Sequence, residues 1–305
     1  MRFWVGVTNI DWYRYQAGEL HDEVNFWQPS ERAPFLAPPA GMPFLFKLKS
    51  PINKIAGFGL FSATSVLPVG MAWDVFGPRN GAPTLQLFQK RLGFEGPESV
   101  SRPMRCTVLS DVYYLPESEW FDLPDGAFPS NVVVGKFFDT DDGLGRHVIA
   151  RVMNTLQRAS EPLTRTPDTI QTGFGQGRWV EPRLGQGAFR TLVTDAYERR
   201  CAITGENTLI ALDAAHIRPY ADEQCHDVQN GLLLRADFHK LFDNGLISIT
   251  PDLTVRVSPQ IANHYFNGKV YYRLDGAPLA QLPSAERYRP DPKRLAWHYE
   301  VKFQH

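Results

Sequence analysis

The sequence predicts an α+β protein of two domains joined by a linker, and three observations lead to this prediction. The 305 residues are about twice the length of an ordinary single domain. Residues 1–160 are dense in short β-type runs with few helical patterns, which indicates a mixed β-barrel with helices. Residues 187–305 contain a strand, a loop, a second strand and a helix in that order. Residues 161–186 are rich in Pro, Gly, Thr and Gln and form the predicted linker.

The elements of the first domain are predicted from periodicity and turn residues. A helix is expected over residues 146–158, because Val148, Val152 and Leu156 recur there at helical spacing. Shorter helical patterns cover residues 72–76 and 84–92. The expected strands are bounded by turn residues and cover residues 3–7, 43–48, 55–62, 106–109 and 132–138.

Composition limits the classes of function. The formal net charge of −1 gives no overall attraction to phosphate, so any nucleic-acid binding has to come from local patches. No apolar run approaches the roughly 20 residues of a membrane span, and the first residues do not form the core of a signal peptide. The three cysteines are widely spaced and odd in number, which fits reduced thiols. We therefore expect a cytoplasmic protein without a membrane partner.

The C-terminal domain has the clearest pattern of elements. An amphipathic helix is expected over residues 187–199 and is followed by a turn and an apolar strand that ends at His216. A polar loop leads to a second short strand that begins at Asn230, and a helix that carries His239 comes next. The alternating pattern of residues 246–258 predicts a hairpin.

At the residues AAHIRPY, QNGLLL and ADFHKLFDNG, preceded by RLGQGAFR, the chain resembles the HNH endonuclease family. The resemblance covers about residues 183–258 and implies a ββα-metal fold and hydrolysis of phosphodiester bonds. His216 lies 14 residues before Asn230, which lies nine residues before His239. The motifs are specific in combination, although no single one is specific alone.

The resemblance implies a catalytic role for each of these three residues. Phosphodiester hydrolysis needs a base that activates water, and the ordinary pKa of histidine, about 6.5, suits His216 to this role. Asn230 is expected to orient that histidine or the loop that carries it. His239 is expected to hold a divalent cation, Mg²⁺ or Mn²⁺, that neutralises charge in the transition state.

The sequence departs from the commoner family pattern at one position. In that pattern an Asp or His directly precedes the base and is the second metal ligand, whereas this chain has Ala215 there. Asp213 points to the same side of a strand as residue 215 and is our candidate replacement. Asp237 and Asp243 on the predicted helix are alternatives. No structural zinc with four cysteines is expected, because the region lacks paired CxxC motifs.

Other charged and titratable residues surround the motif. Three further histidines are interpreted as structural residues, namely His226, His264 and His298. The candidate DNA-binding arginines are Arg183, Arg190 and Arg218.

The first domain resembles the EVE branch of the PUA-like superfamily, which is related to the SRA readers of methylated cytosine. The resemblance rests on the segments FWVGVT, NFWQPS and FLFKLKSPINKIAGFG. It implies a pocket for a flipped nucleobase, where aromatic walls and hydrogen bonds to the base edge offset the lost stacking. The candidate base-binding residues are Trp12, Tyr13, Tyr15, Trp27, Asn25, Gln28 and Ser30. The candidate phosphate-binding residues beside them are Lys47, Lys49 and Lys54.

These patterns predict a modification-dependent DNA endonuclease of the restriction type. The first domain is expected to read 5-methylcytosine or 5-hydroxymethylcytosine in double-stranded DNA, and the HNH domain to cut nearby. Double-strand cleavage needs two active sites, so a homodimer is expected. Two alternatives remain open. One is an HNH endonuclease that depends on backbone phosphorothioate, and the other is a non-catalytic DNA- or RNA-binding protein, which Ala215 favours.

Overall fold

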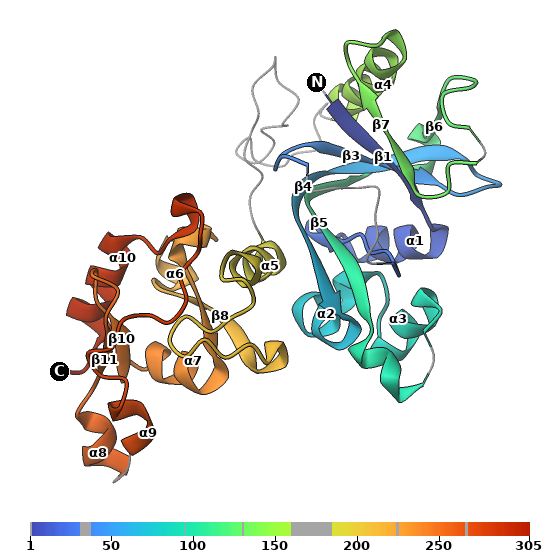
Figure 1. The fold of residues 1–305 in the computed structure, drawn as a ribbon. Helices are drawn as coiled ribbons and strands as arrows, with labels where there is room; N and C mark the ends of the chain where they lie inside the picture. The colour runs from blue at the N-terminus through green and yellow to red at the C-terminus, as the bar shows by residue number, and fades with distance from the viewer. Residues whose placement is uncertain are drawn as a thin grey trace. The chain divides into compact units, whose positions relative to one another are not determined.

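A computed structural model shows two compact units, Met1–Arg183 and Leu184–His305 (Figure 1). The predicted linker, residues 161–186, lies outside the described residues except for its last two positions, and Gln186 already begins a helix. The described residues are 2–30, 38–94, 96–129, 131–159, 185–223, 226–265 and 268–305.

The first unit is built on a mixed sheet with the strand order β2-β5-β4-β3-β1-β7, and β6 pairs with the start of β4. Among the strand pairs of the described residues in this sheet, only β1–β3 is parallel. The strands are β1 (Arg2–Thr8), β2 (Val24–Asn25), β3 (Pro43–Leu48), β4 (Lys54–Pro68), β5 (Pro103–Tyr114), β6 (Phe121–Asp122) and β7 (Gly135–Asp139).

The α+β class is confirmed, but the predicted PUA-like barrel is not found as a closed barrel. Closure requires the first and last strands of the path to pair. Here β2 and β7 end the path, and the described residues form no ladder between them. The strand β2 has only two residues, so it offers little backbone for further pairing.

Both faces of this sheet are buried, which follows from the alternation of side chains along each strand. In β1, Phe3 and Val5 belong to one apolar cluster, whereas Trp4 belongs to another. The first cluster includes Val148 and Val152 of α4, and the second includes residues of α1. The helices of this unit are α1 (Ile10–Glu19), α2 (Val69–Phe76), α3 (Leu85–Leu92) and α4 (Gly143–Ala159), with the shorter η1 (Gly77–Asn80), η2 (Pro97–Ser101) and η3 (Glu117–Glu119).

The second unit contains the predicted strand, loop, strand and helix. β8 (Leu212–His216) and β9 (Gly231–Arg235) are antiparallel, and α7 (Ala236–Asp243) follows β9 directly. A second hairpin is formed by β10 (Ile247–Ile249) and β11 (Val255–Val257). The remaining elements are α5 (Gln186–Ala196), η4 (Leu209–Ala211), α6 (Tyr220–Glu223), η5 (Val228–Asn230), α8 (Gln260–Tyr265), α9 (Lys269–Tyr272), η6 (Glu286–Tyr288), α10 (Pro292–Trp297) and η7 (His298–Lys302).

The core of the second unit places α5 against the β8–β9 hairpin. Phe189 and Val193 of α5 pack in the same cluster as Leu232 of β9 and Phe238 of α7. Gly231 lies where α5 approaches most closely, because a Cβ there would overlap Cγ2 of Val193. This packing brings the N-terminal half of α5 to the end of β8.

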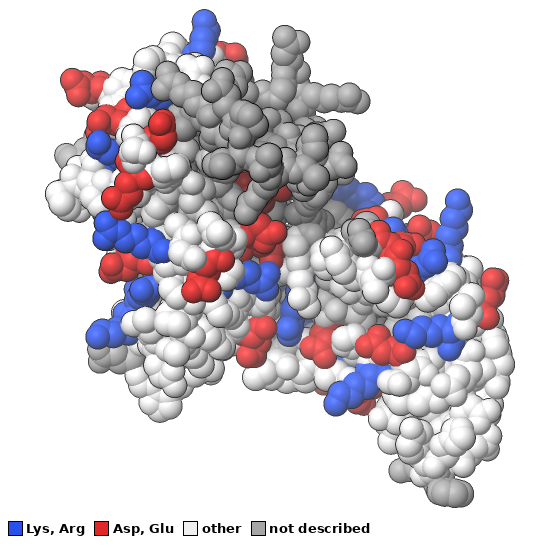
Figure 2. All heavy atoms as spheres, turned by 180° about the vertical axis from the view of Figure 1, so that it is seen from behind, with Lys and Arg blue, Asp and Glu red and all other residues white. Residues whose placement is uncertain are grey.

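Two properties of the described surface bear on function. Among the described residues, none of the helices has the length and hydropathy that a membrane-spanning segment needs. On the face drawn in Figure 2, the described Lys and Arg side chains are interspersed with Asp and Glu side chains. Positive charge on that face is therefore not gathered over the whole surface, which agrees with the net charge of −1.

Candidate functional site

The β8–β9 hairpin and α7 supply the three motif residues of the second unit. His216 is the last residue of β8 and pairs with Gly231, the first residue of β9. Asn230 therefore lies beside the turn that leaves β8, and the backbone N–H of Ile217 donates to its carbonyl oxygen at 2.8 Å. His239 is presented from the middle of α7.

Asn230 is fully buried and binds the backbone just after His216. Its side-chain Oδ1 accepts a hydrogen bond from the backbone N–H of Arg218 at 2.9 Å. Its Nδ2 donates to the carbonyl oxygen of the same residue at 3.0 Å. These paired bonds fix the loop that leaves the strand end, which is the arrangement expected of a residue that orients His216.

His216 is held by stacking and is kept neutral. Its ring lies on the ring of Phe189 with centroids 3.9 Å apart and planes 8° apart. Burial, together with the nearby charges of His226 and His239 in their protonated forms, lowers the pKa of His216 to about 4. A neutral imidazole near pH 7 is the form that can accept a proton.

His239 lies between two carboxylates. Its Nδ1 is 3.4 Å from Oδ2 of Asp213, and its Nε2 is 3.3 Å from Oδ2 of Asp243. The hydrogen bond between His239 and Asp213 lowers the pKa of Asp213 and raises the pKa of His239. Asp213 is therefore an ionised carboxylate at neutral pH, directly beside the histidine imidazole.

The three carboxylates that the sequence offers as alternative metal ligands have different surroundings in the structure. Asp237 is paired with Arg235, whose Nη2 lies 2.6 Å from its Oδ2. Asp213 and Asp243 both face His239. Ala215 is fully buried in the core, so the carboxylate that reaches His239 from β8 comes from position 213.

No group of three or more His, Cys, Asp or Glu side chains suited to a metal ion occurs among the described residues. The carboxylate of Asp213 nevertheless has suitable donor chemistry, since Mg²⁺ is commonly held by one or two carboxylates plus substrate phosphate and water, and His239 would add an imidazole nitrogen beside it.

His226 is a neighbour of His216 that the sequence interpretation placed outside the site. Its Nδ1 lies 3.1 Å from Nε2 of His216. The ring of Tyr220 stacks on it with centroids 4.2 Å apart and planes 15° apart. The only signal in the sequence was its position in the polar loop between two motif elements. By contrast, His298 is a buried core residue, as interpreted, and His264 is exposed.

The candidate arginines have different surroundings. Nη2 of Arg190 lies 3.6 Å from Oδ1 of Asp213, so this guanidinium is part of the site. The guanidinium of Arg218 is paired with Glu223 at 2.9 Å and lies over the ring of Trp297 at 4.7 Å, and its binding of phosphate stays a prediction. Arg183 lies outside the described residues.

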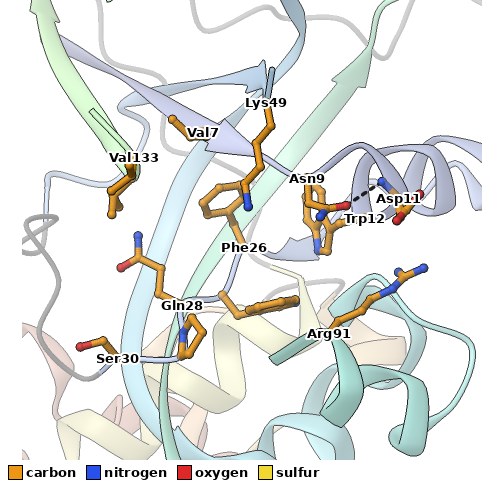
Figure 3. A pocket seen from close by; sticks show the side chains of 13 residues that line it. Val7, Asn9, Asp11, Trp12, Phe26, Gln28, Ser30, Lys49, Arg91 and Val133 are labelled. Carbon is orange, nitrogen blue, oxygen red and sulfur yellow. Dashed lines mark hydrogen bonds between the residues drawn. The ribbon is translucent and has the colours of Figure 1, made fainter. Parts of the chain in front are cut away.

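A cavity of about 380 Å³ lies in the first unit (Figure 3). Five predicted residues line it, namely Trp12, Trp27, Gln28, Ser30 and Lys49. Nε1 of the buried Trp12 has no hydrogen-bond partner among the described residues, and it lies against Gly81. The sequence interpretation missed Val7, Asn9, Asp11, Phe26, Pro29, Arg91, Val133 and Val134, which complete the lining.

The other residues proposed for the reader do not line this cavity. Asn25 is fully buried, where it donates to Oδ1 of Asn80 and accepts from the backbone N–H of Thr107. Nζ of Lys47 donates to Asn53 at 3.1 Å, and only 8% of the residue is exposed, so it does not reach phosphate.

Aromatic and strand contacts account for the remaining candidates. The hydroxyl of Tyr13 is bound to the carbonyl oxygen of Ala56 inside the core. Tyr15 lies beside the ring of His21. Lys54 begins β4, where it pairs with β6. The alternation of polar and apolar residues along short segments did not distinguish these positions from the residues that line the cavity. The reason is that the cavity is formed by segments far apart in the sequence.

Comparison with known proteins identifies one domain. The HNH endonuclease family matches residues 201–250, and the comparison with curated proteins gave no match. Two crystal structures of ZmASCH variants from Zymomonas mobilis align with 10% and 12% identity and a TM-score of 0.34 each. They cover 48% and 49% of this chain and 96% and 94% of their own. The modification-dependent TagI restriction endonuclease aligns with 12% identity and a TM-score of 0.26, over 91% of this chain and 74% of its own.

The family match spans β8, β9 and α7 and includes His216, Asn230 and His239. The chain therefore contains an HNH endonuclease domain at residues 201–250.

Proposed function

We propose that this chain is a cytoplasmic, modification-dependent DNA endonuclease that reads a flipped modified cytosine with its first unit and cuts with its HNH domain. The observation that carries the nuclease part is the cluster at the β8–β9 hairpin and α7. There a neutral histidine, a buried asparagine and an adjacent carboxylate and histidine lie within one domain of the HNH family.

In the proposed reaction, His216 takes a proton from water, and the resulting hydroxide forms the new bond to phosphorus. The bond from phosphorus to the 3′ oxygen breaks, and this oxygen takes a proton from solvent water as it leaves. Phe189 holds the plane of the base, and Asn230 holds the loop that follows it. Arg190 supplies a fixed positive charge beside Asp213, where a phosphate oxygen would be attracted.

Asp213 and His239 would hold a divalent cation, Mg²⁺ or Mn²⁺, with Asp243 restraining the ring of His239. When bound, the cation would neutralise charge on the phosphate. The carboxylate of Asp213 is already ionised, so it needs no proton loss to act as a ligand.

The cavity in the first unit supports the reading of a base. Trp12, Phe26 and Trp27 provide aromatic surface, and Gln28 and Ser30 provide polar groups beside it (Figure 3). An extruded base requires both kinds of contact to offset its lost stacking. In addition, Lys49 and Arg91 line the cavity, where they would contact the phosphates that flank the base.

The proposal is tested by a cleavage panel with Mg²⁺ or Mn²⁺. Matched DNA substrates carry cytosine, 5-methylcytosine, 5-hydroxymethylcytosine, its glucosylated form or phosphorothioate. Preferential cutting of a modified-cytosine substrate is expected. Equal cutting of all substrates would contradict the reader role. Preference for phosphorothioate would establish the alternative endonuclease, and binding without cleavage of any substrate would establish a non-catalytic protein.

We also propose that the enzyme acts as a homodimer, since cutting both strands of a duplex needs two active sites. Sedimentation of the protein with a modified duplex should show two chains per DNA. One chain per DNA combined with nicking of a single strand would contradict the dimer but not the nuclease.

A further inference from the structure

We propose that His226 is a positioning residue that selects the tautomer of His216, by accepting a hydrogen bond from Nε2–H of His216 at its own Nδ1. The inference extends the proposed endonuclease activity and assigns a role to a histidine that lies outside the three motif positions. It rests on the contact between the two rings and on the restraints that hold each ring in place.

The two imidazoles share one hydrogen-bond contact. Nε2 of His216 lies 3.1 Å from Nδ1 of His226, and the ring centroids are 5.2 Å apart. Separate aromatic rings hold the two partners, because Phe189 stacks on His216 and Tyr220 stacks on His226. The pair is therefore built into the packing of α5, β8 and the segment that follows α6.

A single proton lies between these two nitrogens when both rings are neutral. Its position decides whether His216 has an unprotonated nitrogen that can accept a proton from water. If the proton belongs to His226, then His216 must carry its own proton on Nδ1 and has no free nitrogen for water. If the proton belongs to Nε2 of His216, its Nδ1 is unprotonated and can accept a proton from water. Only the second arrangement is compatible with His216 as the base.

The neighbouring groups favour a neutral acceptor at His226. Burial lowers the pKa of His226, so the ring is uncharged near neutral pH. After His216 has taken a proton, its Nε2–H becomes a charge-assisted donor to the same acceptor. His226 therefore assists the protonated form of His216 through this hydrogen bond.

The tautomer is measured directly by two-bond ¹H–¹⁵N correlation spectra of the full chain labelled with ¹⁵N-histidine. The signals of the pair are assigned from the variants His216→Ala and His226→Ala. We expect His216 to carry its proton on Nε2 in the wild type and to become a mixture of tautomers in His226→Ala. A proton on Nδ1 of His216 in the wild type would overturn the proposal, whether or not the protein cuts DNA.

Kinetics supply the second measurement. His226→Ala should lower kcat by about 10- to 100-fold, as is typical when the hydrogen-bond partner of a functional histidine is removed. KM for DNA should remain unchanged, because the proposed role of His226 acts through His216 and not through binding of the substrate. His226→Asn places a carbonyl oxygen near the position of Nδ1 and should restore most of the activity. His264→Ala is the matched control, since it removes an exposed histidine of the same unit.

Thermal unfolding of each variant separates a positioning role from a structural one. Rescue by Asn but not by Ala, at equal unfolding temperatures, supports the proposal. Equal kcat in the wild type and His226→Ala overturns it while leaving the endonuclease function intact. A wild type that cuts no substrate but shows the Nε2–H tautomer removes the endonuclease function and retains the assignment of the pair.

Discussion

His216 is neutral near pH 7 because burial opposes its charged form, and its plane is fixed by Phe189. In the proposed mechanism this residue therefore supplies a free nitrogen in a defined position. Asp213 has the opposite character, since His239 and Arg190 favour its ionised form. The proposed base and the proposed anionic ligand thus differ in charge because of their surroundings, although they belong to the same strand.

The variant His216→Ala should lower the rate of DNA cleavage by about 100- to 10,000-fold, because a positioned general base contributes acceleration of that order. The rate is measured on supercoiled modified DNA with Mg²⁺ or Mn²⁺. His264→Ala should cut at the wild-type rate. Undiminished cutting by His216→Ala would show that another group activates water.

The variant Trp27→Leu should weaken binding of DNA that carries a modified cytosine by about tenfold or more, since stacking of a base on an aromatic ring contributes about 1–3 kcal/mol. Binding is measured by fluorescence anisotropy with modified and unmodified duplexes. Tyr15→Leu is the control, because Tyr15 does not line the cavity. Equal losses in the two variants would contradict the assignment of the cavity as the reader.

At the scale of elements, the position of His216 depends on how α5 packs against the β8–β9 hairpin. Phe189 belongs to α5, His216 ends β8, and Gly231 is the residue that pairs with His216. The close approach is possible because Gly231 has no side chain. Any change that pushes α5 outward therefore moves the ring that supports the base.

Gly231→Val should destabilise the second unit by about 1–3 kcal/mol, which is the usual cost of adding carbon atoms to a packed core. DNA cleavage should fall as well, because Phe189 moves with α5. Calorimetry follows the unfolding transition of the unit. Gly18→Ala is the control, since a Cβ there meets nothing within 4 Å, and it should leave that transition unchanged. An unaltered transition in Gly231→Val would contradict the packing argument.

His298 joins η7 to α7 and β10 in its neutral form. Its ring stacks on Phe242 at 3.7 Å, its Nδ1 contacts the hydroxyl of Ser248, and its Nε2 contacts the carbonyl oxygen of Phe242. A carbonyl oxygen only accepts, so Nε2 carries the proton and Nδ1 accepts from the hydroxyl. Burial lowers the pKa of His298 to about 4.

This histidine should make the second unit less stable as the pH falls. Between its ordinary pKa of 6.5 and the folded value of about 4, the unfolded chain binds a proton that the folded chain does not. Stability is therefore lost as the pH falls through this window, and no further loss comes from His298 below it. From about pH 7 to about pH 5 the loss is about 2 kcal/mol. Calorimetry should show a smaller loss in His298→Gln, and an equal loss in both would contradict the assignment.

At the scale of the whole molecule, the cavity belongs to the first unit and the nuclease cluster to the second. Each unit has its own buried apolar cluster. The proposed recognition and the proposed cleavage therefore belong to parts of the chain that have separate cores.

A fragment of residues 184–305 should fold and cut DNA without preference for modified cytosine. Folding is measured by circular dichroism and thermal unfolding, and preference by competition between modified and unmodified duplexes. The full chain is the control. A fragment that discriminates as well as the full chain would show that the first unit is not the reader.

The sequence was sufficient to determine the order of elements around the HNH motif. The apolar strand ending at His216, the strand after Asn230 and the helix carrying His239 all depend on local periodicity and turn residues, which act over a few positions. The same local signals predicted the helix that became α4 and the strands that became β1 and β3. These local signals did not distinguish a closed barrel from an open sheet.

Only the tertiary structure decided which side chains meet. It placed Asp213 and Asp243 beside His239, turned Asp237 toward Arg235, and brought His226 to His216. It also divided the N-terminal aromatic and polar residues into core and cavity. These outcomes depend on strand register and on packing between segments distant in the sequence, which contribute no periodic signal to the chain itself.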